Sequence, residues 1–257
     1  MNLLQSNELI NRVLLILGAY SFSIPVVSLI HEIGHILAMM SVGITQYILV
    51  INPFTESSAT PLVPLPAEHL LYLSVSGMIF QTVVFVVIGA LVWRSRSVLM
   101  CPLMMCLPMS MINVGSYLLM GAIVEGSDVV MMTEAGVPPM LIQIFGLVTL
   151  MFGLWSFTRL LPVAGFKQND SRASVFLPLF IGTGLYSFTM LMYGYLSGYG
   201  TMIGVINVIS SFITGVVYTW IFKKSKIPLE FNTPSSLDSY KVLGIGLTAV
   251  FLCFLIF

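Results

Sequence analysis

Long apolar stretches dominate this chain and restrict what it can fold into. Seven of them approach or exceed the length needed to cross a bilayer: 13–42, 70–93, 98–124, 140–161, 175–196, 202–222 and 243–257. A helix needs about 20 residues to cross the hydrocarbon core, where only helices and closed barrels satisfy their backbone groups. We therefore expect an all-α polytopic transmembrane bundle of about seven spans, with residues 1–257 forming one integral membrane domain embedded in the lipid bilayer.

The composition agrees with this assignment. Charged residues make up 8% of the chain, whereas about a quarter is usual for a soluble domain. The formal net charge is zero and no long lysine or arginine run occurs, so nucleic acid is not an expected partner.

The basic residues predict an orientation because they fall at alternate ends of successive spans. All ten lie on one side of the expected bundle: Arg12, Arg94, Arg96, Arg159, Lys167, Arg172, Lys223, Lys224, Lys226 and Lys241. The positive-inside rule makes that side cytoplasmic. We expect a cell inner or plasma membrane protein with its N-terminus in the cytoplasm.

The interval 43–66 after the first span is rich in Pro, Ser and Thr. It contains a strand-like run at 46–51, followed by Asn52-Pro53 as a turn. A short β-hairpin and a plain surface loop are both compatible with this pattern. A hairpin at membrane depth would have to lie in the interface or against protein, because lipid-exposed open strands are not viable.

The first span carries His31-Glu32-Ile33-Gly34-His35, an H-E-x-x-H motif that holds two of the three histidines of the chain. On a helix, the i, i+4 spacing places both imidazoles on one face about 6 Å apart, which suits two ligands of one Zn²⁺. Glu32 lies beside them as a candidate catalytic base. Ionisable residues within a span are costly unless they have a function, which argues against a chance match.

A catalytic zinc usually takes three protein ligands, so His31 and His35 need a partner from elsewhere in the chain. Asp170 and Asp238 fall on the basic side. Asp128 follows a span on the acidic side, and His31 lies about 28 Å along its helix from Arg12, so all three ligands should meet near the non-cytoplasmic boundary. Asp128 could instead cap a helix, and other residues on that side could replace it as ligand: Glu56, Glu68, His69, Glu125 and Glu134.

Two further polar side chains lie in mid-span, where each needs a partner. Gln81 and Asn113 are candidates for donating a hydrogen bond to an oxyanion or for positioning a substrate. Both could equally pack helices together.

These motifs resemble the site-2 protease family of intramembrane zinc metallopeptidases, in particular a compact bacterial branch. The likeness lies in Ser-Leu-Ile-His-Glu-Ile-Gly-His-Ile-Leu-Ala at 28–38, in 43–53, and in Gly126-Ser127-Asp128 followed by Glu-Ala-Gly-Val-Pro at 134–138. The segment 76–81 stands where such proteins often show Gly-Pro-x-x-Asn, here with Met78 and Gln81 in place of proline and asparagine.

The resemblance implies a zinc site in residues 1–137 and hydrolysis of a peptide bond in or near a transmembrane segment of a membrane-anchored protein. It assigns no role to the additional helices of 138–257. The alternative is a metal-binding membrane transporter or metal-handling protein that uses the same ligands without protease activity. The sequence predicts no oligomeric state.

Overall fold

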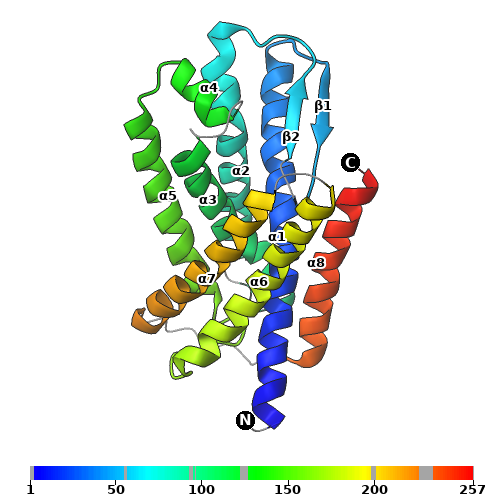
Figure 1. The fold of residues 1–257 in the computed structure, drawn as a ribbon, viewed down its shortest axis with the longest axis vertical. Helices are drawn as coiled ribbons and strands as arrows, with labels where there is room; N and C mark the ends of the chain where they lie inside the picture. Colours follow the sequence, from blue (N-terminus) through cyan, green and yellow to red (C-terminus); the bar gives the residue numbers. More distant parts are fainter. Residues whose placement is uncertain are drawn as a thin grey trace.

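The computed structural model describes residues 3–54, 57–92, 95, 97–121, 127–197, 201–225 and 234–256, with side chains except at 3–6, 201–211 and 214. Its elements follow the order α1 (Leu3–Ser41), β1 (Tyr47–Val50), β2 (Ser58–Pro61), η1 (Ala67–His69), α2 (Leu70–Val92), η2 (Val98–Met100), α3 (Cys101–Met120), α4 (Asp128–Glu134), α5 (Pro139–Leu160), α6 (Arg172–Ser197), α7 (Thr201–Lys224) and α8 (Ser236–Ile256). Figure 1 shows these helices gathered into one elongated bundle.

The expected all-α membrane bundle is confirmed. Six helical segments within the described residues are long and apolar enough to cross a membrane. The sixth expected span, 202–222, forms helix α7, which is not among these six segments. The last expected span, 243–257, begins earlier than its apolar run because Ser235 and Asp238 cap the start of α8 with reciprocal hydrogen bonds of 3.1 and 3.3 Å.

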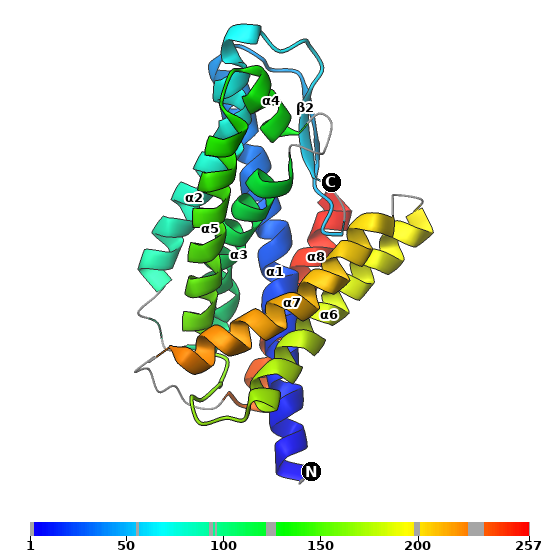
Figure 2. The ribbon, with the colours of Figure 1, turned by 60° about the vertical axis from the view of Figure 1, so that its left-hand side comes forward.

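Helix α1 is the axis of the bundle and packs against α2, α3, α6 and α8. Helix α5 lies outside α3, and α6 pairs with α7. Figure 2 shows the α6–α7 pair inclined to α1, α3 and α5. The largest hydrophobic core joins α1, α3, α5, α6 and α7, and in it Phe157 of α5 stacks on Tyr218 of α7 with ring centroids 3.9 Å apart.

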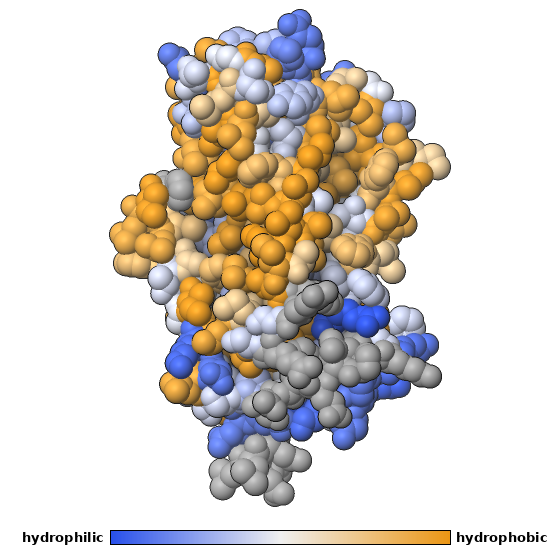
Figure 3. Space-filling model, turned by 180° about the vertical axis from the view of Figure 1, so that it is seen from behind, coloured by the Kyte–Doolittle hydropathy of each residue, from blue (hydrophilic) through white to orange (hydrophobic). Residues whose placement is uncertain are grey.

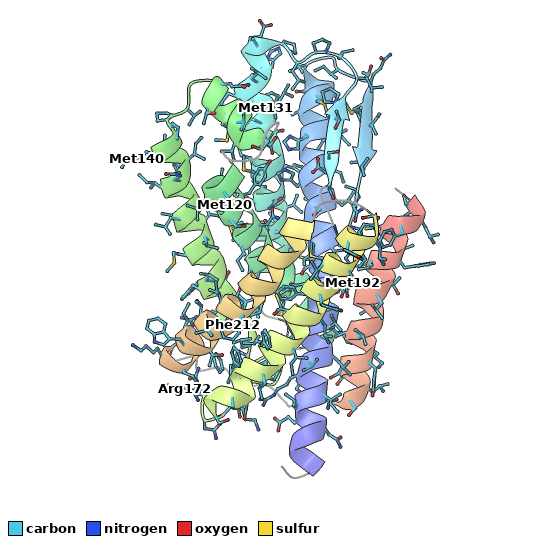
Figure 4. All side chains as sticks on the ribbon, in the orientation of Figure 1. Met120, Met131, Met140, Arg172, Met192 and Phe212 are labelled. Carbon is cyan, nitrogen blue, oxygen red and sulfur yellow. The ribbon has the colours of Figure 1, made fainter. Side chains whose placement is uncertain are left out.

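The surface divides into a hydrophobic belt and two more polar ends, as Figure 3 shows for one face. Arg172 lies at the end of the bundle opposite to Met131 of α4 (Figure 4). At the Arg172 end, the buried Arg12 pairs with Asp170 at 2.8 Å and with Glu8 at 2.6 Å. Lys223 donates to the carbonyls of Gln168 and Asp170 at the same end. We call this the basic end.

The interval after α1 forms a β-hairpin, as one of the two interpretations predicts. Strands β1 and β2 pair antiparallel, with Leu49 opposite Ala59 and Val50 opposite Ser58. Tyr47, Leu49 and Ala59 face inward and pack on a cluster that includes Ile36 and Met39 of α1. The hairpin therefore lies against protein along the upper half of α1 (Figure 1).

Candidate metal centre

Helix α1 presents the two motif histidines to the interior of the bundle. Their Nε2 atoms lie 3.0 Å apart, and their ring centroids are separated by 4.7 Å. This close approach follows from helical geometry, which stacks residues at i and i+4 on one face.

Asp128 joins this pair from a different part of the chain. Its Oδ2 atom lies 3.4 Å from His31 Nε2 and 3.3 Å from His35 Nε2. The three side chains together could hold a metal ion, and they form the one such group of His, Cys, Asp and Glu in the described part of the chain. Their side chains are 11–14% exposed, so the centre is sheltered but can be reached.

Asp128 is the first residue of α4, but the helix is capped by its neighbour. Ser127 Oγ accepts from the Val130 amide at 3.3 Å and donates to the Gly121 carbonyl at 2.6 Å. The amide of Asp128 donates to the Tyr117 hydroxyl at 3.1 Å. Ser127 therefore does the capping, and the Asp128 carboxylate is left to face the histidines.

The charge of Asp128 suits a metal ligand. Burial raises the pKa of its carboxyl, but hydrogen bonds from His31 and His35 outweigh burial and bring that pKa down to about 2. Asp128 is therefore ionised at neutral pH.

The other ring nitrogens of both histidines have acceptors. His31 Nδ1 donates to Gln81 Oε1 at 3.0 Å, and His35 Nδ1 donates to the Leu73 carbonyl at 2.9 Å. The Gln81 amide nitrogen donates to the Ser110 carbonyl at 3.2 Å, which turns its oxygen toward His31. If a cation takes the place of the Nε2 protons that bond Asp128, both imidazoles can stay neutral with their remaining protons on Nδ1, and both Nε2 lone pairs then face the same side as Asp128 Oδ2. Three electron-rich atoms converge, an arrangement that a cation between them would stabilise.

Two glycines allow α1 and α2 to approach closely enough for these contacts. A Cβ atom on Gly34 would lie 2.9 Å from Gly77 Cα, and a Cβ atom on Gly77 would lie 2.5 Å from His35 Nε2. Any larger residue at position 77 would occupy space that the ligand atom needs.

Glu32 lies between the metal group and the hairpin. Its side chain is 5% exposed and close enough to His31, His35 and Asp128 to interact with their charges. The backbone of Ala59 in β2 lies close enough to the Glu32 carboxyl to interact with it. The carboxylate thus has a fixed place beside the group that could hold a metal.

Gln81 and Asn113, the two other polar candidates, lie in different environments. Gln81 is fully buried and orients His31. Asn113 is exposed on α3, and its side chain takes no part in the hydrogen bonds that connect the centre among the described residues. Sequence patterns treat them alike, because both are amides in mid-span.

None of the alternative ligand candidates that fall within the described residues joins the metal group. His69 and Glu68 lie together in η1, with His69 Nε2 3.9 Å from a carboxylate oxygen of Glu68. Glu134 is exposed at the far end of α4. Glu56 and Glu125 lie outside the described residues.

The sequence does not predict three features that support the metal group: the Tyr117 hydroxyl, the Leu73 carbonyl and the absence of a Cβ atom at Gly77. Tyr117 offered a signal, since it is a polar side chain near the end of an apolar segment. A backbone carbonyl and a missing Cβ give no sequence signal until the rotation of α2 against α1 is known.

No protein-family profile, no curated protein and no solved structure matches this chain. Two oriented imidazoles, an ionised carboxylate and an adjacent buried carboxylate can together bind a divalent cation and transfer a proton beside it.

Proposed function

We propose that this protein is an intramembrane zinc metalloprotease that hydrolyses a peptide bond in or near a transmembrane segment of a membrane-anchored protein. One observation carries the proposal: Glu32 lies beside a three-ligand group whose imidazoles are both oriented by acceptors at Nδ1. A metal site with three protein ligands leaves a position for water, and an adjacent carboxylate is the base that metallopeptidases use. The resemblance of the motifs to the site-2 protease family supports the same assignment.

The ligand spacing supports zinc. Tetrahedral coordination with bonds of about 2.0–2.1 Å places ligand atoms about 3.3 Å from one another. The three distances within the group are 3.0, 3.3 and 3.4 Å. Two imidazoles and one carboxylate are also a ligand set found in catalytic zinc sites.

The protein's own residues would then move the protons. Zinc, when bound, supplies Lewis acidity that makes water more acidic and polarises a peptide carbonyl. Glu32 accepts the proton of the attacking water on a carboxylate oxygen and returns it to the leaving amine. Gln81 and Leu73 keep His31 and His35 in the tautomer that binds metal through Nε2.

The substrate must expose its backbone before it can be cut. A peptide bond within a transmembrane helix is already hydrogen-bonded, so the segment has to unwind locally. Among the described strands, β2 pairs only with β1, which leaves its other edge able to pair with an extended peptide. Ala59 of β2 contacts Glu32, so a peptide on that edge would lie beside the base.

The test uses purified protein in liposomes with synthetic single-span peptides, one with a central Gly-Pro and one made of leucine throughout. We expect zinc-dependent cleavage, faster for the Gly-Pro peptide, detected as fragments by mass spectrometry. Glu32→Gln should retain one zinc per chain and lose cleavage by at least about 100-fold. Glu8→Gln is the matched control, because Glu8 lies on the same helix at the basic end.

Three results would reject the proposal. The first is cleavage that Glu32→Gln leaves unchanged, and the second is the absence of zinc-dependent cleavage by the parent protein. The third is zinc flux into the liposomes that survives Glu32→Gln but is lost in His31→Ala, which would identify a transporter.

A further inference from the structure

The turn of the hairpin is held by an aromatic cluster on the additional helices. Phe54 packs against Tyr186 and Tyr193 of α6 and against Phe254 of α8, with ring centroids 5.6–5.7 Å apart. Tyr193 and Phe254 also contact one another, at 5.9 Å. One ring from the turn is therefore surrounded by three rings from two helices.

Hydrogen bonds reinforce this contact. The Tyr186 hydroxyl, which is buried, donates to the Pro53 carbonyl. The Asn52 side-chain amide donates to the Tyr193 hydroxyl at 3.3 Å. Within the turn, Asn52 Oδ1 accepts from the Phe54 amide at 2.9 Å, which fixes the direction of the Phe54 backbone. We call Asn52, Phe54, Tyr186, Tyr193 and Phe254 the clasp.

The clasp lies one strand pair away from the residue that contacts Glu32. Val50 and Ser58 are the pair of the ladder nearest the turn, and the next pair is Leu49 with Ala59. The backbone of Ala59 interacts with the Glu32 carboxyl, and its side chain packs on the cluster that includes Ile36 of α1. The turn and the residue beside the base are thus neighbours in the ladder.

The hairpin needs such support because it is short. Each strand has four residues, and a two-stranded hairpin of this size is marginally stable by itself. At the other end it is joined to the chain near α1, where the Leu62 amide donates to the Gln46 carbonyl at 2.9 Å. Figures 1 and 2 show the turn meeting α6 and α8 near the C-terminus, far from α2 and α5.

We propose that α6 and α8 hold the hairpin against α1 through the clasp, which makes Phe54 and Tyr186 positioning residues for Glu32. This gives the helices of 138–257 a function in catalysis although none of them supplies a metal ligand among the described residues. The proposal rests on the protease function proposed above.

The test combines two clasp variants with two matched controls on α6. Tyr186→Phe removes the hydrogen bond to Pro53, and Phe54→Ala removes the central ring. Tyr195→Phe and Phe188→Ala make the same changes at side chains that are 70% and 54% exposed. Phe54→Tyr keeps the ring and should behave as the parent protein does.

A cysteine probe measures hairpin release without reference to activity. Ile51 is buried beside the turn, so Ile51→Cys should react slowly with a maleimide when the clasp is closed. We expect at least 10-fold faster labelling of Cys at position 51, followed by peptide mass spectrometry, when Phe54→Ala or Tyr186→Phe is added. The clasp variants without the probe should keep their zinc and Tm and show kcat reduced about 10-fold with little change in KM.

Several outcomes would overturn the proposal. Unchanged labelling would mean that these contacts do not hold the hairpin, and faster labelling with unchanged kcat would mean that hairpin position does not matter for Glu32. Loss of zinc and a drop in Tm in both variants would indicate a purely structural role. If the parent protein does not cleave the Gly-Pro peptide, the protease function fails, whereas the labelling rates still decide whether the clasp holds the hairpin.

Discussion

Gln81 on α2 accepts a 3.0 Å hydrogen bond from His31 Nδ1 on α1, and its amide group donates to Ser110 on α3. The side chain thus connects three helices and fixes the direction of one imidazole of the group that could hold a metal. Such outer partners of metal-binding histidines set the tautomer and raise the basicity of the ligand.

Replacement of Gln81 should therefore weaken metal binding. Gln81→Leu removes the acceptor for His31 Nδ1 and should lower zinc affinity by about 10- to 100-fold, measured by competition with a chromogenic chelator. Asn113→Leu, at the exposed amide of α3, should leave the affinity unchanged. Equal losses in the two variants would contradict the role assigned to Gln81.

A methyl group at position 77 should displace a ligand. The added Cβ atom of Gly77→Ala would lie 2.5 Å from His35 Nε2, so we expect the purified variant to contain no stoichiometric zinc by metal analysis. Gly184→Ala is the control, since nothing lies within 4 Å of its added Cβ and alanine favours a helix over glycine by up to about 1 kcal/mol. A full zinc complement in Gly77→Ala would show that α2 can move away without harm.

Loss of the Tyr117 hydroxyl should loosen Asp128. The Asp128 amide would lose its 3.1 Å acceptor in Tyr117→Phe, a net cost of about 1 kcal/mol, or about fivefold in zinc affinity. Calorimetric titration of the metal-free protein with zinc would measure this difference. The control Tyr195→Phe should bind zinc with the affinity of the parent protein. If Tyr117→Phe also has the parental affinity, the hydrogen bond from the Asp128 amide to Tyr117 does not help to position Asp128.

The ion pair at the basic end should affect stability but not the metal centre. Arg12 and Asp170 are largely buried, so Asp170→Asn should lower the free energy of unfolding by about 1.5–3 kcal/mol, because it removes the more buried of the two carboxylates that pair with Arg12. Glu8→Gln removes a 40% exposed partner and should cost at most about 1 kcal/mol. Denaturant unfolding in detergent would distinguish the two variants. Zinc affinity should stay unchanged in both, because Arg12 lies about 28 Å from His31 along α1. A change in zinc affinity would contradict this prediction.

Much of this fold and part of its site could be predicted because membrane insertion leaves few alternatives. Apolar length predicts the helices, and the sorting of basic residues predicts that Asp128 lies at the same end as His31 and His35. The i, i+4 spacing predicts the facing imidazoles. The hairpin is one of two structures that the sequence of 43–66 allows, since four-residue strands give only a weak pattern.

The remaining features depend on how the helices are rotated and where they break. Gln81 and Asn113 have the same chemistry, and only the rotation of α2 and α3 buries one and exposes the other. Apolar residues continue to position 124, which hides the fact that Asp128 begins a separate seven-residue helix. The role of Tyr117 follows from that break, because α4 needs an anchor on α3.

The short helix α4 also gives a bound metal a mechanical role. His35 and Asp128 lie roughly ninety residues apart in the chain, so an ion that joins them would act as a removable crosslink across a long loop. Seven residues of helix have little stability of their own, whereas α1 is embedded in the bundle over most of its length. Removal of the ion by a chelator should therefore first fray α4, while the surrounding helices stay in place.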